Sequence, residues 1–207
     1  MVVAAGSAKL DAQDGRIARG LRTREAILSA YEALITNESV PPTGTELALR
    51  AGVSPRSIFT HFGDMDGVLA GAARCAFDWI VETHIDISCE LSLEQRLDRF
   101  TWRQAEILER TAPLYRMFRS VRQGGRRGTS PAVNEILGGV DQIRRRYVEF
   151  LFGHEFGLMA PRERDLMMEA LVVTCSWNVW EGLRSAQSLD PDTAARVMKR
   201  LMASLLS

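Results

Sequence analysis

The chain has 207 residues with 26 basic and 26 acidic side chains, a formal net charge of zero and an apolar fraction of 46%. This length allows one large domain or two small ones, and the composition excludes a disordered or collagen-like protein. A formal net charge of zero argues against a protein that coats nucleic acid or an acidic membrane through a general excess of basic residues. A DNA-binding protein of this composition has to use local charge.

The sequence shows no pattern typical of membrane insertion, export or metal binding. The longest run without a charged residue, 170–180, has 11 residues, whereas a spanning helix needs about 20. Residues 1–9 have too short an apolar run for a signal peptide. Cys75, Cys89 and Cys175 are widely spaced, which favours three small buried apolar residues over disulfides or paired metal ligands. We predict a cytoplasmic protein without a metal or a cofactor.

Helix signals dominate the chain. No sustained alternation of apolar and polar residues occurs, whereas Ser-Pro, Asp-Pro and Ala-Pro pairs mark helix starts and apolar residues repeat at helical spacing between them. An all-α fold with about nine helices is predicted. The expected helices lie near residues 16–37, 44–51, 55–61, 64–90, 92–111, 113–123, 131–152, 161–187 and 191–206.

The expected helices fall into two length classes, which indicates two parts of the chain. Two very short helices precede residue 62, and only long ones follow it. We predict a flexible arm at residues 1–15, an N-terminal unit at 16–66 and a larger helical body at 67–207.

Residues 43–62 carry a pattern typical of a helix-turn-helix motif, in which two short helices cross over a turn of three or four residues. Ala48 allows close approach of the second helix, and Gly52 can adopt the left-handed conformation that ends the first one. Ser54 caps the second helix, so its first side chains point outward, where a recognition helix meets base edges. The alternative is a helical hairpin packed inside an all-α protein.

The block from Arg22 to Leu69 resembles the DNA-binding domain of the TetR family of bacterial transcription regulators. The residues that match the family pattern are Arg24-Ile27-Leu28, Thr43-Leu47-Ala48-Ala51-Gly52-Val53-Ser54 and Ile58-Phe59-His61-Phe62. The resemblance implies a repressor that binds a near-palindromic double-stranded DNA operator as a homodimer and is released by a small-molecule effector. The body at 67–207 would then serve ligand binding and dimerisation. An all-α enzyme or a structural helical bundle is the alternative.

The resemblance also implies which residues contact DNA. Thr43 corresponds to a phosphate contact, and Arg56 leads the set that reads bases. The full set is Thr43, Thr45, Ser54, Arg56, Ser57, Phe59, Thr60 and His61. Phe59 and Met65 stand where the family has a tyrosine and a lysine, so a hydroxyl and a cation that would reach phosphates are missing, and binding should depend less steeply on salt.

Basic residues gather at the start of the first helix. Residues 1–74 contain eight basic and eight acidic side chains, yet Arg16, Arg19, Arg22 and Arg24 lie within nine residues that hold no acid. We predict that this cluster, above all Arg19 and Arg22, clamps the DNA backbone. The alternative is a solvated face near a frayed helix start.

The helical body contains the residues expected for the effector and for the second subunit. The expected pocket residues are Trp102, Met117, Phe118, Tyr147, Phe150, Met168 and Trp177, with plain core packing as the alternative. The resemblance implies that the last two helices form the dimer interface, with Leu166, Ala170, Trp180, Met198, Leu201 and Leu205 as contacts. The segment 110–134 holds six arginines and no acid, and it is either the mouth of an anion site or a solvated loop. The arginines are Arg110, Arg116, Arg119, Arg122, Arg126 and Arg127.

Overall fold

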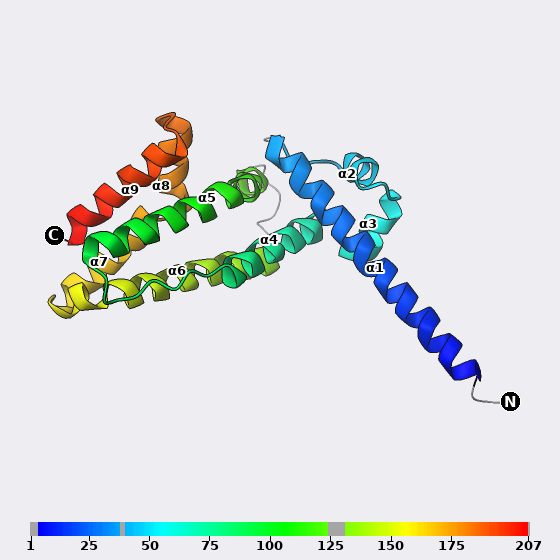
Figure 1. The fold of residues 1–207 in the computed structure, drawn as a ribbon. Coiled ribbons are helices and arrows are strands. Elements are labelled where there is room, and N and C mark those ends of the chain that lie inside the picture. The colour runs from blue at the N-terminus through cyan, green and yellow to red at the C-terminus, as the bar shows by residue number, and fades with distance from the viewer. Residues whose placement is uncertain (1–3, 38–39, 124–130, 207) are drawn as a thin grey trace. The chain divides into compact units, whose positions relative to one another are not determined.

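The computed structural model describes residues 4–37, 40–123 and 131–206, and among these residues it contains helices but no strands. The predicted all-α fold is therefore confirmed (Figure 1). The elements are α1 (Ala4–Asn37), α2 (Gly44–Ala51), α3 (Pro55–Phe62), α4 (Met65–Glu82), α5 (Leu93–Gln123), α6 (Pro131–Gly157), α7 (Pro161–Thr174), α8 (Trp177–Glu181), the π-helical turn η1 (Gly182–Ala186) and α9 (Pro191–Leu206).

The chain forms two compact units. The first comprises Met1–Cys75 and Arg116–Val133, and the second comprises Ala76–Tyr115 and Asn134–Ser207. No helix in the described part of the chain is long and apolar enough to cross a lipid bilayer.

The first unit is built on one face of α1. Ile27 and Tyr31 of α1 are buried together with Leu47 of α2, Ile58 of α3 and Val68 of α4. Each large apolar side chain buried in this way stabilises the fold by roughly 1.5–3 kcal/mol. Burial, and to a lesser degree the charge of Asp66, raises the pKa of the Tyr31 hydroxyl far above its usual value. The core therefore holds α2 and α3 against α1.

The core of the second unit is formed mainly by α5, α6, α7, α8 and α9. Its largest fully buried side chains include Phe100, Phe152 and Trp180. A buried ion pair joins α5 to the end of α6, because Arg96 donates to both carboxylate oxygens of Glu155, at 2.6 and 3.0 Å.

Several predicted helix boundaries were wrong. α1 begins at Ala4 rather than near residue 16. The end predicted near residue 152 coincides with a kink, because Phe152 has non-helical φ −114° and ψ 17°, and a further helical stretch continues to Gly157. α4 ends at Glu82 rather than near residue 90. In the segment that follows, Ile87 enters the core and the Tyr147 hydroxyl donates to the Ile85 carbonyl. These distant contacts replace the helix that local spacing favoured.

Pro113 does not separate two helices, as the sequence suggested, but lies inside α5. A proline in a helix interior removes one backbone hydrogen bond. The neighbouring Ala112 and Leu114 are both buried, and this packing holds the helix together across the proline.

The helix predicted at 161–187 is interrupted instead of continuous. Cys175 leaves helical geometry, at φ −94° and ψ 19°, between α7 and α8. The Gln104 amide nitrogen donates to the Cys175 carbonyl at 2.9 Å, so a side chain of α5 occupies the acceptor that the break frees. Burial raises the pKa of the Cys175 thiol to about 12. Cys75 and Cys89 are exposed, contrary to the expectation that all three cysteines are buried.

Candidate functional site

The turn between α2 and α3 is defined by local signals that the sequence shows. Thr43 and Glu46 form a capping box at the start of α2, with the Thr43 backbone N–H donating to the Glu46 carboxylate at 2.7 Å. That hydrogen bond is the main cause that lowers the pKa of Glu46. Gly52 ends α2 with φ 67°, in the left-handed region where a side chain would be strained. The predicted helix-turn-helix is therefore present in the structure.

The cap of α3 organises its first turn. The Ser54 hydroxyl accepts the Ser57 backbone N–H at 3.2 Å and lies 2.9 Å from the Ser57 hydroxyl. Pro55 occupies the first helical position, where its missing N–H costs nothing. Ser54 and Ser57 are thus bound to each other, and their hydroxyls position the helix end.

The helix-turn-helix exposes polar side chains to solvent and buries an apolar side chain of α3. Ile58 is fully buried, whereas Arg56 and Thr60 are exposed on the same helix and Thr45 is exposed on α2. The Thr60 hydroxyl donates to the Arg56 carbonyl at 2.9 Å, which holds its methyl group and oxygen in one orientation. The structure thus brings the predicted residues of α2 and α3 onto one small unit.

Arg24 of the predicted arginine cluster packs against α3. Its guanidinium lies over the Phe62 ring, 4.4 Å from the centroid, and its Nη1 donates to the His61 carbonyl at 3.1 Å. Arg24 therefore ties α1 to the last turn of α3. Its side chain supports α3, and sequence reasoning missed this role.

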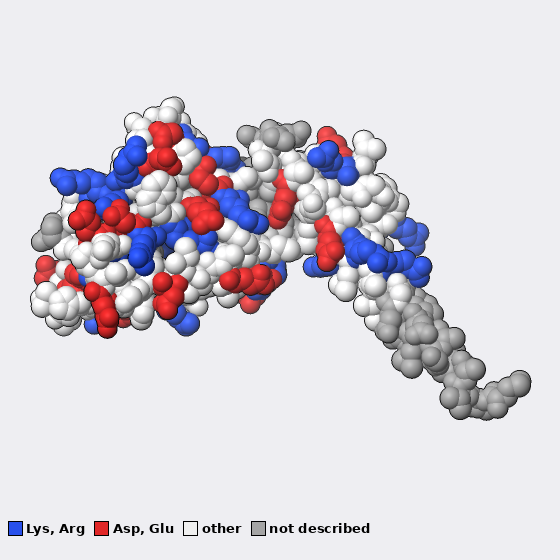
Figure 2. Space-filling view, viewed as in Figure 1, with Lys and Arg blue, Asp and Glu red and all other residues white. Residues whose placement is uncertain are grey.

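Arg19 and Arg22 are exposed on α1, and Figure 2 shows basic side chains gathered on the surface of the first unit near α1. The side chain of Arg16 lies outside the described part. Phe59, which stands where the family has a tyrosine, is 51% exposed, and Met65 is half-buried at the start of α4. The side chains at these two positions are therefore apolar where the resemblance implies a hydroxyl and a cation.

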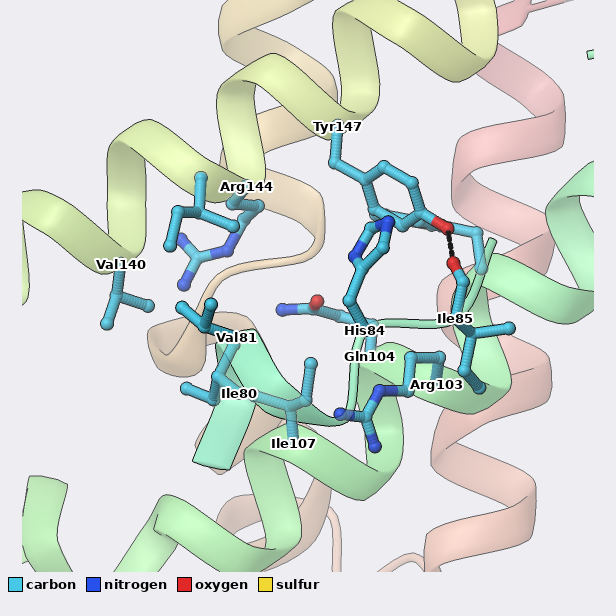
Figure 3. Close-up of a pocket in the computed structure, with 12 residues that line it drawn as sticks. Ile80, Val81, His84, Ile85, Arg103, Gln104, Ile107, Val140, Arg144 and Tyr147 are labelled. Carbon is cyan, nitrogen blue, oxygen red and sulfur yellow. Dashed lines mark hydrogen bonds between the residues drawn. The ribbon is translucent and has the colours of Figure 1, made fainter. Parts of the chain in front are cut away.

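The second unit contains a cavity of about 210 Å³ between α4, α5, α6 and the segment after α4 (Figure 3). Most of its lining is apolar, with polar groups from Arg103, Gln104, Arg144, Tyr147 and His84. The apolar lining residues are Ile80, Val81, Ile85, Phe100, Ile107, Val140 and Ile143. Burial, with a further contribution from the charge of Asp86, raises the pKa of the Tyr147 hydroxyl to about 12, so this group is a neutral hydrogen-bond donor.

Comparison with known proteins identifies the fold. No protein-family model matches the sequence, and no curated protein matches it significantly. A TetR-family transcriptional regulator from Streptomyces coelicolor superposes with a TM-score of 0.66 at 17% identity, over 88% of this chain and 78% of that one. A transcriptional regulator from Rhodococcus sp. superposes with a TM-score of 0.66 at 17% identity, over 88% and 95% of the two chains. The chain has the TetR-family fold.

A third structure with this TetR-family fold is described as the multidrug binding protein EbrR complexed with imidazole. It superposes with a TM-score of 0.55 at 17% identity, over 86% of this chain and 93% of that one.

Within this TetR-like body, the predicted pocket residues are dispersed. Tyr147 lines the cavity, and Trp177 is buried and stacked on Tyr115, with ring centroids 3.9 Å apart. Met168 belongs to the core, and Trp102 and Phe150 are half exposed. Met117 and Phe118 are buried within the segment assigned to the first unit. Spacing along a helix could not show which apolar residues face the cavity.

The predicted dimer residues divide into a surface set and a core set. Leu166 of α7 and Leu201 of α9 are exposed at 66% and 44%, and Ala170 and Leu205 are half-buried. Val173, which the sequence analysis did not select, is 57% exposed on α7. These five residues form what we call the α7/α9 face. Trp180 and Met198 are fully buried instead, and the Trp180 indole N–H donates to Glu109 at 2.8 Å.

The arginine-rich segment 110–134 is described only in part. The Arg110 guanidinium lies 4.1 Å from the centre of the Trp79 ring, so it packs within the second unit. Arg116 and Arg119 are exposed on α5. Arg126, Arg127 and the side chain of Arg122 lie outside the described residues. Among the residues that the structure describes, no three His, Cys, Asp or Glu side chains gather as a metal site would require.

Proposed function

We propose that this chain is a DNA-binding transcription regulator that acts as a homodimer and responds to a small molecule. The observation that carries the proposal is the geometry of α2 and α3, in which buried Leu47 and Ile58 leave Arg56 and Thr60 exposed. A helix presented in this way fits the major groove, where arginine can bind O6 and N7 of guanine. The unit at 16–66 would bind DNA in the bacterial cytoplasm, and the body at 67–207 would regulate it.

The proposed DNA contacts have distinct tasks. Arg56, Ser57 and Thr60 would read bases together with Thr45, while Thr43 and His61 would contact phosphates. Ser54 would act by positioning α3, Phe59 would make apolar contacts, and Arg19 and Arg22 would clamp the backbone. The neutral charge of the whole chain favours specific reading of a site over indiscriminate binding.

The α7/α9 face supports the proposed dimer. Exposed apolar side chains at Leu166, Val173 and Leu201 would be removed from water by a second copy of the same face. A two-fold dimer would present two recognition helices to successive major grooves, which requires a near-palindromic operator. The cavity in the second unit would hold the effector, and its occupation would release the operator. The proposed role as a repressor follows from the resemblance to the TetR family.

Selection from random DNA duplexes with the full chain tests the proposal. We expect enrichment of a two-fold symmetric sequence. Replacing Arg56 by alanine should cost about 1–3 kcal/mol on that sequence and relax the preference at one position in each half-site. The control is Arg50→Ala, which removes an exposed arginine of α2 outside the proposed contacts. Failure to enrich any sequence would refute the proposed DNA recognition.

The dimer is tested by sedimentation of the full chain. Val173→Asp places a charge in the α7/α9 face and should convert the dimer to a monomer. Leu158→Asp is the matched control, because Leu158 is 79% exposed outside that face. Equal dissociation of the two variants would show that the interface lies elsewhere.

A further inference from the structure

The cavity of the second unit contains a polar group that the folded chain leaves unsatisfied. The Arg144 side chain is only 10% exposed, and its Nε has no hydrogen-bond partner among the described residues. Its Nη1 donates to Asp141 at 2.7 Å, and the Asp141 side chain is 67% exposed. Asp141 therefore holds the solvent end of the guanidinium. Figure 3 shows the guanidinium directed toward the side chains of Val81 and Val140 in the cavity.

The charges around the cavity favour an anion. The Arg103 side chain, 6% exposed, is a second guanidinium in the lining, and no Asp or Glu is among the described residues that line it. The acid that pairs with Arg103 is Glu106, whose side chain is 59% exposed, so its charge is screened by solvent. A buried cation with an unused donor is unfavourable until an acceptor reaches it. An anionic oxygen near Arg144 supplies the acceptor that Nε lacks and adds a less solvent-exposed negative charge than that of Asp141.

The size and apolar character of the cavity define the rest of the ligand. A dry apolar cavity of about 150 Å³ can hold benzene, so about 210 Å³ accommodates one ring with a short substituent. The side chains of Ile80, Val81, Ile107 and Val140 provide an apolar wall for such a ring. The Tyr147 hydroxyl already donates to the Ile85 carbonyl and the Gln104 amide to the Cys175 carbonyl, whereas Arg144 Nε has no acceptor among the described residues.

We propose that the cavity binds a small monocarboxylic acid with one ring or a branched apolar group of similar size, and that its carboxylate accepts a hydrogen bond from Arg144 Nε. The assignment rests on the proposed function in treating this cavity as the effector site. It places the anion-binding group inside the second unit, in contrast to the arginine-rich segment 110–134 that the sequence suggested.

Calorimetric titration of the full chain with benzoate, without DNA, tests the ligand class. Benzamide is the neutral comparator of equal shape. We expect benzoate to bind about tenfold more tightly than benzamide, because the carboxylate adds an opposite charge to the hydrogen bond from Arg144 Nε. A biphenyl carboxylate should not bind, because its second ring exceeds the cavity. Equal affinity for the acid and the amide, or no binding of either, would overturn the proposal.

Variants locate the carboxylate. Arg144→Met should reduce benzoate affinity by about tenfold and benzamide affinity by less, because the neutral carbonyl gains less from the guanidinium than the carboxylate does. The matched control is Arg146→Met, which removes an exposed arginine of the same helix outside the lining. Equal losses in both variants would overturn the assignment to Arg144. If Arg144→Met fails to fold, the comparison of acid and amide in the unmodified chain still decides the ligand class.

The two proposals fail separately. Benzoate binding in a chain that enriches no DNA sequence would refute the regulator and keep the ligand class. Enrichment of an operator by a chain that does not distinguish benzoate from benzamide would keep the proposed regulator and refute the ligand class.

Discussion

Replacing Arg24 by alanine should destabilise the first unit without removing a phosphate contact. The change deletes the contact with the Phe62 ring at 4.4 Å and the hydrogen bond to the His61 carbonyl at 3.1 Å. A cation–π contact at an exposed site contributes about 0.5–1 kcal/mol, and a hydrogen bond from a charged donor contributes about as much or more. The expected loss is about 1–2 kcal/mol of the free energy of unfolding. For a chain of this size it lowers the melting temperature by roughly 2–8 °C.

The matched variant is Arg22→Ala, on the same helix and exposed to solvent. Each lost phosphate contact reduces the slope of log K against log salt concentration by about 0.9. Arg22→Ala should therefore flatten the salt dependence of DNA binding and leave the melting temperature unchanged. Arg24→Ala should lower the melting temperature and leave the slope unchanged. A flattened slope with an unchanged melting temperature for Arg24→Ala would refute the assignment of Arg24 as a support of α3.

Three further predictions concern other contacts. Glu155→Ala should lower the free energy of unfolding by about 3–5 kcal/mol in urea, because it leaves Arg96 buried without its partner; a loss below about 1 kcal/mol would contradict this. Met65→Lys should steepen the salt slope of DNA binding by about 0.9 if the added ammonium group reaches a phosphate, and an unchanged slope would exclude that contact. The capping box lowers the pKa of Glu46, so it stabilises α2 above the ordinary carboxyl pKa and ceases to do so as the pH falls through the lowered value. In an NMR titration, Thr43→Ala should raise that pKa toward the ordinary value.

Local signals predicted the helix-turn-helix because each signal acts within a few residues. The expected helices at 44–51 and 55–61 match α2 and α3 closely, since Thr43, Gly52 and Ser54 determine their ends through neighbouring backbone groups. The roles of Arg19 and Arg22 stay predictions. The support by Arg24 was missed because its partners lie at the far end of α3, and no local spacing predicts that contact.

The body of the chain was less predictable because distant side chains decide its breaks. Cys175 lies in an uncharged run that predicted one continuous helix, and at the break its carbonyl accepts a hydrogen bond from Gln104 of α5. The cavity escaped prediction for a similar reason, because Arg144 and Arg103 come from different helices. An arginine near apolar residues in a sequence is normally a solvated residue on a helix face. Only the packing of α5 and α6 shows that these two are buried.

α2 and α3 carry the side chains proposed to read DNA, and we call the two helices together the reading surface. Their shortness affects how this surface folds. Each has eight residues, and helices of this length do not persist in water by themselves. They exist because Leu47 and Ile58 are buried in the core that α1 completes. The reading surface therefore unfolds cooperatively with that core, and the backbone amides of α3 should exchange with solvent at the rate at which the first unit opens. A core substitution in α1 should thus abolish the proposed operator binding although every side chain proposed to contact DNA is still present.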